Sequence, residues 1–171
     1  MPDRPYVRRS ARVLLLDAAD RLLLLCFYKH PHRPDLGYCW VTPGGGINDG
    51  EPLREAAARE LHEEVGLAVA PAALGSVVAV TSGYADLGSV AGVFRDDYFF
   101  HRVTAHEVDA SGQEDWERSQ LTAHRWWTIA ELASTTETVY PFGLVGLLTD
   151  LAAGRLPGEP VHLPWHHDEA A

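Results

Sequence analysis

The segment PGGGINDGEPLREAAARELHEEVGL, residues 43–67, restricts the fold of this chain more than any other. Its three consecutive glycines allow unusual backbone angles and a close approach of main chain to another group. A helix pattern follows over residues 52–65, with Pro52 suited to the first turn and Gly66 to the position just past the end. The segment therefore predicts a tight glycine turn that leads directly into a helix.

Three glutamates, Glu60, Glu63 and Glu64, stand close together on this predicted helix. Residues three and four apart share a helix face, so the three carboxylates fall within an arc of about 100°. Like charges at this spacing repel, and helix stability gains nothing from them. Three hard oxygen ligands are what Mg²⁺ or Mn²⁺ requires. The alternative is a solvated acidic face, helped by the pair Glu55–Arg59.

Read as a whole, the segment matches GX5EX7REUXEEXGU, in which U is an aliphatic residue. Gly45 begins the match, Glu51 follows, and Leu67 closes it, with every fixed position filled. The chain therefore resembles the Nudix hydrolases. The stretches WVTPGGG upstream and HRWWTIAEL downstream agree with that family, so the resemblance extends over most of Ala11–Leu132.

The resemblance implies an α/β fold, an α/β/α sandwich with a mixed sheet and a loop–helix–loop metal site. Such proteins cleave a phosphoanhydride bond in a nucleoside diphosphate derivative by attack of water on phosphorus, with Mg²⁺ or Mn²⁺. Carried over residue by residue, the catalytic metal ligands are Glu60, Glu63, Glu64 and the carbonyl of Gly45. Arg59 and Glu51 would form a supporting ion pair between helix and loop.

The general base is expected to be either a glutamate of the box or an acidic residue of a downstream loop. That loop offers Glu114, Asp115 and Glu117, just before the strand pattern RWW. Glu117 is the first choice from its position. The alternative is that all three are solvated loop charges.

Three further residues are candidates for substrate contacts: Arg95, Tyr84 and His30. Arg95 could meet a phosphate, although Asp96 and Asp97 offer it ordinary partners. The region TSGYADL lacks the proline associated with ADP-ribose enzymes, whereas Tyr84 lies near a position associated with diadenosine polyphosphate enzymes. The sequence leaves nucleoside triphosphates and nucleotide sugars as further possible substrates.

The 171 residues fit a single domain, with a core at about 10–153 and a polar C-terminal tail that holds His166 and His167. Strands are expected at 11–16, 22–27, 39–41, 74–81, 92–103 and 125–128. Thr128 and Glu131 form a possible capping box for a short helix, and a final amphipathic helix is expected over 141–154. Residues 105–123 read as a long acidic loop.

The net charge of −10 argues against nucleic acids and anionic membranes as partners. The apolar runs near the N-terminus are too short to span a membrane, and two cysteines without metal-type spacing favour reduced thiols. We therefore expect a cytoplasmic protein with a small nucleotide-type substrate, and a homodimer is possible.

Two other functions stay open. One is a Nudix-fold sensor that binds a nucleotide without turnover, although such proteins usually lose glutamates of the box. The other is an enzyme like isopentenyl diphosphate isomerase, for which Cys39 could supply a catalytic thiol, but the sequence around it does not resemble that enzyme.

Overall fold

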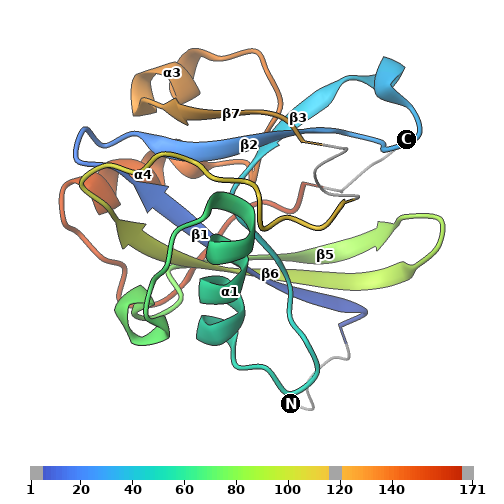
Figure 1. Cartoon of the computed structure of the whole chain (residues 1–171), viewed down its shortest axis with the longest axis horizontal. Helices are drawn as coiled ribbons and strands as arrows, with labels where there is room; N and C mark the ends of the chain where they lie inside the picture. Colours follow the sequence, from blue (N-terminus) through green and yellow to red (C-terminus); the bar gives the residue numbers. More distant parts are fainter. Residues whose placement is uncertain (1–5, 116–120, 167–171) are drawn as a thin grey trace.

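A computed structural model describes residues 6–115 and 121–166 (Figure 1). The strands within these residues are β1 Arg8–Leu16, β2 Leu22–Tyr28, β3 Tyr38–Val41, β4 Gly44–Gly46, β5 Ala79–Asp86, β6 Ala91–Arg102, β7 Leu121–Trp127, β8 Val139–Tyr140 and β9 Val161–His162. The helices are η1 Pro34–Leu36, α1 Leu53–Val65, η2 Pro71–Leu74, α3 Ile129–Ser134 and α4 Leu144–Ala152. Among the described residues, no helix is both long and apolar enough to cross a membrane.

The nine strands form one mixed sheet, as expected, in the order β8-β3-β2-β1-β6-β5-β9, with β4 paired to β1 and β7 paired to β2. The pairs β1–β6, β3–β8 and β5–β9 are parallel. β1 and β2 pair only beside their turn, at Leu16 and Leu22. At its other end β1 pairs instead with the glycines of β4. This divergence brings the glycine turn into the middle of the sheet.

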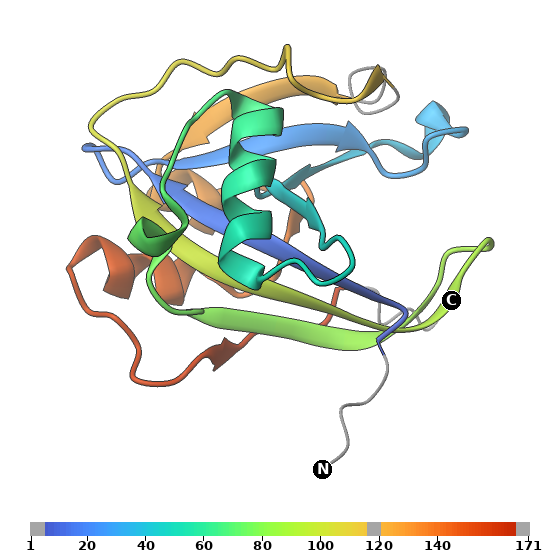
Figure 2. The ribbon, with the colours of Figure 1, turned by 60° about the horizontal axis from the view of Figure 1, so that its bottom comes forward.

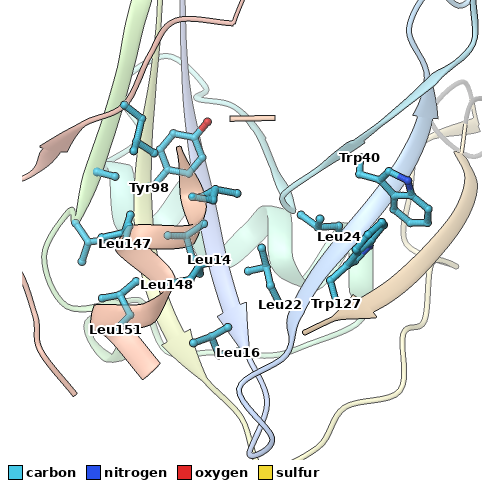
Figure 3. Packing of buried hydrophobic residues seen from close by; sticks show 14 of the residues in the cluster. Leu14, Leu16, Leu22, Leu24, Trp40, Tyr98, Trp127, Leu147, Leu148 and Leu151 are labelled. Carbon is cyan, nitrogen blue, oxygen red and sulfur yellow. The ribbon is translucent and has the colours of Figure 1, made fainter. Parts of the chain in front are cut away.

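Alternation along β1 divides the core into two layers. Val13 and Leu15 belong to the cluster under α1, whereas Leu14 and Leu16 belong to the cluster that contains α4. Figure 2 shows α1 across one face of the sheet and α4 beyond the other. Figure 3 shows the cluster on the α4 side, where Trp127 packs edge-on against Trp40 at a centroid distance of 5.2 Å. The predicted sandwich with a mixed sheet is therefore confirmed.

The local predictions hold best where the pattern is strong. α1, β1, β2, β3 and β6 begin and end within three residues of the predicted positions. The capping box is confirmed, because the Thr128 hydroxyl accepts from the Glu131 amide and the Glu131 carboxylate accepts from the Thr128 amide. Residues 105–114 contain no helix or strand, as expected, whereas Asp115 is already helical.

Three predicted boundaries are wrong. The strand expected at 74–81 runs instead over Ala79–Asp86, because pairing with β6 continues through the polar residues assigned to a loop. The strand expected at 125–128 begins at Leu121, since it pairs along β2. The last helix starts at Leu144 and not at Pro141, because residues 139–140 pair with β3 as β8.

The C-terminal residues also differ from the polar tail that the sequence suggested. Val161 and His162 form β9, which adds to the edge of the sheet beside β5. Leu163 is buried, and its amide donates to the carbonyl of Val80. The chain therefore stays attached to the sheet well beyond α4.

Candidate metal and substrate site

The helix that carries the glutamates is held by its apolar face and by its two ends. Ala57, Leu61 and Val65 are fully buried against the sheet, as the helical spacing predicts. Pro52 precedes the first turn, and Gly66 closes the last turn at φ 74° with its amide donating to the carbonyl of His62. These contacts fix which face of α1 points toward the glycine turn.

The three glutamates do not share one environment. Glu60 and Glu64 are buried, each 6% exposed, whereas the Glu63 side chain is 37% exposed. Glu64 Oε2 accepts a hydrogen bond of 3.1 Å from the Gly44 amide. The Glu60 carboxylate lies against Gly45, where an added Cβ would stand 2.6 Å from Glu60 Oε1. Helix and glycine turn therefore meet at these carboxylates.

Gly44 is the position at which only glycine fits. Its φ is 148°, and a Cβ there would stand 2.4 Å from the Ala11 carbonyl oxygen and 2.6 Å from Arg12 Cγ. Glycine alone reaches such angles without strain. The close approach of Gly44 to β1 leaves its amide facing Glu64, which explains why the turn needs glycine just before this helix.

Arg59 connects the loop to the helix, as predicted, and it also binds two glutamates of the box. Its Nε and Nη2 donate to the two oxygens of Glu51 at 2.8 and 2.9 Å, and Nη2 also donates to the Gly46 carbonyl. Its Nη1 donates to Glu60 at 2.9 Å and to Glu63 at 3.3 Å. The hydrogen bonds from Arg59 lower the pKa of Glu51, and the hydrogen bonds to Glu51 and Glu60 and the charges of both raise the pKa of Arg59.

Within the part of the chain that the structure describes, no three His, Cys, Asp or Glu side chains are already arranged as a set of metal ligands. Glu60 and Glu63 accept from Arg59 instead, and Glu64 accepts from Gly44. The three glutamate carboxylates nevertheless fit a hard divalent cation. They share one helix face, and the single guanidinium of Arg59 does not neutralise their combined charge. A cation would take the place of Arg59 Nη1 beside Glu60 and Glu63.

The acidic loop is anchored on the C-terminal end of α1. His106 Nε2 lies 2.6 Å from the Val65 carbonyl oxygen, and the Asp109 amide donates to that same carbonyl. Gln113 is buried and donates to the Glu64 carbonyl at 3.4 Å. Glu114 and Asp115 follow directly and are exposed. Glu117, the first choice for the base, lies outside the described residues.

Two of the three predicted substrate contacts lie on paired strands, since Tyr84 stands opposite Val93 and Arg95 opposite Ser82, and the third lies elsewhere. Arg95, on β6, forms an ion pair of 3.0 Å with the buried Asp97, the ordinary partner that the sequence offered. Tyr84 is 60% exposed and lies within β5, beyond the end of the strand expected at 74–81. His30 is exposed in the turn between β2 and β3. The structure does not bring these three together.

One polar group beside the box was missed. Arg12 points to the α4 side of β1, where its Nη1 donates to the Thr42 carbonyl at 3.1 Å and its Nε lies 3.3 Å from Asp96 Oδ2. Burial opposes its charge, but Asp96 and, more weakly, Tyr98 and Glu64 favour it, and its pKa is raised. The sequence did contain a sign of this group, because Arg12 stands at an inward position of the largely apolar strand SARVLLL.

A hollow of about 1170 Å³ lies elsewhere. It is lined by η2, the end of β6, α4 and the segment after α4, and no residue of the box lines it. Size alone therefore does not locate the site.

The glycine turn, the buried glutamates and the Arg59–Glu51 pair form one loop–helix–loop unit. The family model described as NUDIX domain matches residues 7–143. The chain therefore belongs to the NUDIX family.

Known proteins with similar sequences are named as phosphohydrolases. An RNA pyrophosphohydrolase of Dinoroseobacter shibae is 45% identical over 65 residues, which cover 38% of this chain and 37% of that protein. Diphosphoinositol polyphosphate phosphohydrolase 2 of Rattus norvegicus is 28% identical over 120 residues, which cover 68% of this chain and 55% of that protein. These matches span about a third to a half of the relatives' own length.

A solved structure supports the fold. The MutT protein from Methanosarcina mazei aligns over 90% of this chain and 98% of its own, with a TM-score of 0.61 and 18% sequence identity. At that identity the likeness concerns the fold alone.

Replacing Gly45 by Ala tests the contact between turn and helix. The added Cβ would stand 2.6 Å from Glu60 Oε1, so the carboxylate must move. We expect the variant to bind Mg²⁺ about 10- to 100-fold more weakly, as measured by calorimetry. Gly146, in α4, is the matched control because an added Cβ there meets no atom within 4 Å. Equal weakening in Gly146→Ala, or none in Gly45→Ala, would contradict the assignment.

Proposed function

We propose that this chain is a Mg²⁺- or Mn²⁺-dependent hydrolase that cleaves a phosphoanhydride bond in a nucleoside diphosphate derivative. The observation that carries the proposal is the packing of a complete box. Glu60 lies against Gly45, Glu64 accepts from Gly44, and Glu63 stands half-exposed beside them. The names of the relatives, pyrophosphohydrolase and phosphohydrolase, support the same reaction class.

Glu60, Glu63, Glu64 and the Gly45 carbonyl would hold the cation. When bound, it would neutralise the pyrophosphate and lower the pKa of a coordinated water. The chain's own part is to position these ligands. Arg59 fixes the loop through Glu51 and the Gly46 carbonyl, so the turn keeps its place against α1. This is catalysis by positioning and electrostatics, in which no protein nucleophile is required.

The general base is proposed to come from the acidic loop. The support is the anchoring of residues 105–115, because Gln113 and Asp109 bind backbone carbonyls of the last turn of α1. Glu114 and Asp115 therefore lie close along the chain to a fixed point beside Glu64. Glu117 stays the first choice for the base as a prediction. A base must come within hydrogen-bond reach of the attacking water, directly or through one more water.

The substrate is proposed to be a small nucleotide-type diphosphate in the cytoplasm. Cys26 and Cys39 are both buried free thiols, which fits a reducing compartment. The acidic box requires a cation between the chain and any phosphate, which agrees with an anionic substrate despite the net charge of −10.

Hydrolysis of a substrate panel with Mg²⁺ or Mn²⁺ tests the proposal. The panel contains ADP-ribose, diadenosine polyphosphates, nucleotide sugars, and plain and oxidised nucleoside triphosphates. Two more compounds follow from the relatives' names, a 5′-triphosphorylated RNA and a diphosphoinositol polyphosphate. We expect metal-dependent turnover of one nucleotide class, lost on chelation of the metal.

Two results would contradict the proposal. Tight nucleotide binding without turnover across the panel would favour the sensor. Isomerisation of isopentenyl diphosphate, with no phosphate released, would favour the isomerase. Product analysis by ³¹P NMR separates hydrolysis from isomerisation directly.

A further inference from the structure

One peptide group, between Pro43 and Gly44, connects strand β1 to the helix that carries the glutamates. Its carbonyl, on Pro43, accepts from the Val13 amide at 2.9 Å, and its N–H, on Gly44, donates to Glu64 Oε2 at 3.1 Å. A peptide group is planar and rigid, so its carbonyl and its N–H turn together. The orientation of this peptide group therefore sets where the Glu64 carboxylate is held.

Arg12 holds the carbonyl just before this peptide group. Its Nη1 donates to the Thr42 carbonyl at 3.1 Å, and Arg12 stands opposite Gly44 in the ladder between β1 and β4. The Thr42 hydroxyl is buried and has no hydrogen-bond partner among the described residues, so it does not fix the turn. Together, Arg12 and the Val13 amide hold two consecutive carbonyls at the entrance to the box.

Arg12 also packs directly on Gly44. A Cβ added to Gly44 would stand 2.6 Å from both Cα and Cγ of Arg12. The stem of Arg12 therefore fills the space beside Gly44 on the side away from Glu64. A shift of Arg12 would leave that space open and allow the turn to move.

Asp96 fixes the guanidinium of Arg12. Arg12 Nε lies 3.3 Å from Asp96 Oδ2, and Asp96 is 8% exposed. Arginine presents its donors in a rigid planar fork, so one side chain can bind Asp96 and the Thr42 carbonyl together. Lysine has a single nitrogen on a flexible stem and cannot reproduce this arrangement.

The guanidinium has little room to move away. The cavity beside it has a volume of about 20 Å³, room for about one water molecule. His166 lines this cavity and stacks on Tyr140, with ring centroids 4.6 Å apart. The interpretation of His166 as a residue of a polar tail is therefore wrong, since it is half-buried in an aromatic contact. His167 lies outside the described residues.

We propose that Arg12 is a positioning residue for Glu64, and that it acts through the turn Thr42–Gly44. The carrying observation is the chain of contacts in which Arg12 binds the Thr42 carbonyl and packs on Gly44, whose amide binds Glu64. This inference rests on the proposed function, because it names a residue that prepares one ligand of the cation. Arg12 acts through the backbone and touches neither the cation nor the substrate.

The ion pair with Asp96 makes this role compatible with a cation at Glu64. Burial opposes the charge of Arg12, but nearby acidic groups, Asp96 first and Glu64 among them, raise its pKa. Arg12 is therefore charged, and Asp96 balances that charge. A divalent cation at Glu64 then meets no uncompensated positive charge from Arg12.

Amide hydrogen exchange, measured by NMR in chelator, tests the contact chain without metal or turnover. In Arg12→Lys and Arg12→Gln we expect the Gly44 amide to exchange at least about tenfold faster than in the natural chain. The Val103 amide, which donates to the Leu16 carbonyl at the far end of β1, reports the opening of the whole sheet and corrects for lost stability. Arg21→Lys is the matched control, because Arg21 pairs with the buried Asp17 at 2.7 Å beyond the other end of β1. It should leave the Gly44 rate unchanged after the same correction.

Metal affinity gives the second readout. We expect Arg12→Lys and Arg12→Gln to bind Mn²⁺ about tenfold more weakly by calorimetry, whereas Arg21→Lys binds it as the natural chain does. The Mg²⁺ concentration for half-maximal kcat should rise by the same factor, with KM at saturating Mg²⁺ unchanged. Asp96→Asn removes the anchor of the guanidinium and leaves the charge of Arg12 unbalanced, so it should weaken Mn²⁺ binding in the same direction.

Unchanged Gly44 exchange or unchanged Mn²⁺ affinity in folded Arg12 variants would overturn the inference and leave Arg12 a purely structural residue. An equal effect of Arg21→Lys on either readout would also overturn it. If the Arg12 variants do not fold, Asp96→Asn decides, and natural Mn²⁺ affinity in that variant overturns the inference. Failure of the natural chain to bind Mn²⁺ would count against the proposed function instead, and the exchange rates in chelator would still test whether Arg12 holds Gly44.

Discussion

Replacing Glu64 by Gln is expected to lower turnover by about 10²–10³-fold while the fold stays intact. Glutamine has the shape of glutamate, and its amide oxygen can still accept from the Gly44 amide. What it loses is the negative charge that a divalent cation requires. Glu63→Gln should show the same loss, although Glu63 is far more exposed. The comparison therefore separates metal binding from packing.

The matched control is Glu55→Gln, on the first turn of the same helix and exposed. It removes one negative charge from α1 and should change turnover by less than about twofold. The measurements are kcat as a function of Mg²⁺ concentration and the thermal midpoint of each variant. Wild-type activity in Glu63→Gln or Glu64→Gln would show that the metal assignment is wrong.

Local patterns were sufficient to predict α1 and the glycine turn. The helical spacing, Pro52 and Gly66 act within a few residues of one another, and the structure shows each where the sequence predicts it. The Arg59–Glu51 pair was predicted only through the resemblance to the family. The additional hydrogen bonds from Arg59 to Glu60 and Glu63 depend on side-chain orientation, which spacing leaves undetermined.

The sheet edges and the small cavity beside Arg12 depend on distant partners and could not be predicted locally. β8 and β9 are two residues each and form only because β3 and β5 offer open edges to them. That cavity, of about 20 Å³, is lined by Arg12 together with Tyr140 and His166, which lie more than a hundred residues away along the chain. Such combinations follow from the curvature of the whole sheet.

Arg12 shows what a closer reading of the sequence could have found. It occupies an inward position between the apolar residues Ala11 and Val13, and a buried arginine needs a partner. Asp96 supplies that partner from β6. The pair could be expected only once β1 and β6 are known to be neighbours.

Replacing Arg59 by Gln is expected to lower the free energy of unfolding by about 2–3 kcal/mol without metal. This is less than the roughly 3–5 kcal/mol for breaking a fully buried pair, because the Arg59 side chain is 27% exposed. The loss arises because Glu51 and Glu60 keep their charges without the guanidinium. Chemical denaturation in chelator measures it. Arg54→Gln, on the exposed side of the same helix, loses only the hydrogen bond from Arg54 Nε to the Gly75 carbonyl and should lower the free energy of unfolding by less than about 1 kcal/mol.

The acid side of the stability profile gives a second test of Arg59. Hydrogen bonds from Arg59 lower the pKa of Glu51 in the folded chain. That contribution is fully present above the unfolded pKa and is lost as pH falls through the folded pKa. In Arg59→Gln, stability should therefore depend less on pH in this acid range. The double variant Glu51→Gln, Arg59→Gln should be more stable than Arg59→Gln alone, because it removes one uncompensated carboxylate.

Mg²⁺ should stabilise Arg59→Gln and the natural chain by different amounts. In the natural chain a cation must displace Arg59 from Glu60 and Glu63, whereas in Arg59→Gln nothing cationic stands there. Binding to the folded state alone raises the free energy of unfolding by an amount that grows with the logarithm of the affinity. We therefore expect saturating Mg²⁺ to stabilise Arg59→Gln more than the natural chain, with kcat still reduced because the loop is no longer fixed through Glu51. An equal gain in both proteins would mean that Arg59 and the cation do not share these carboxylates.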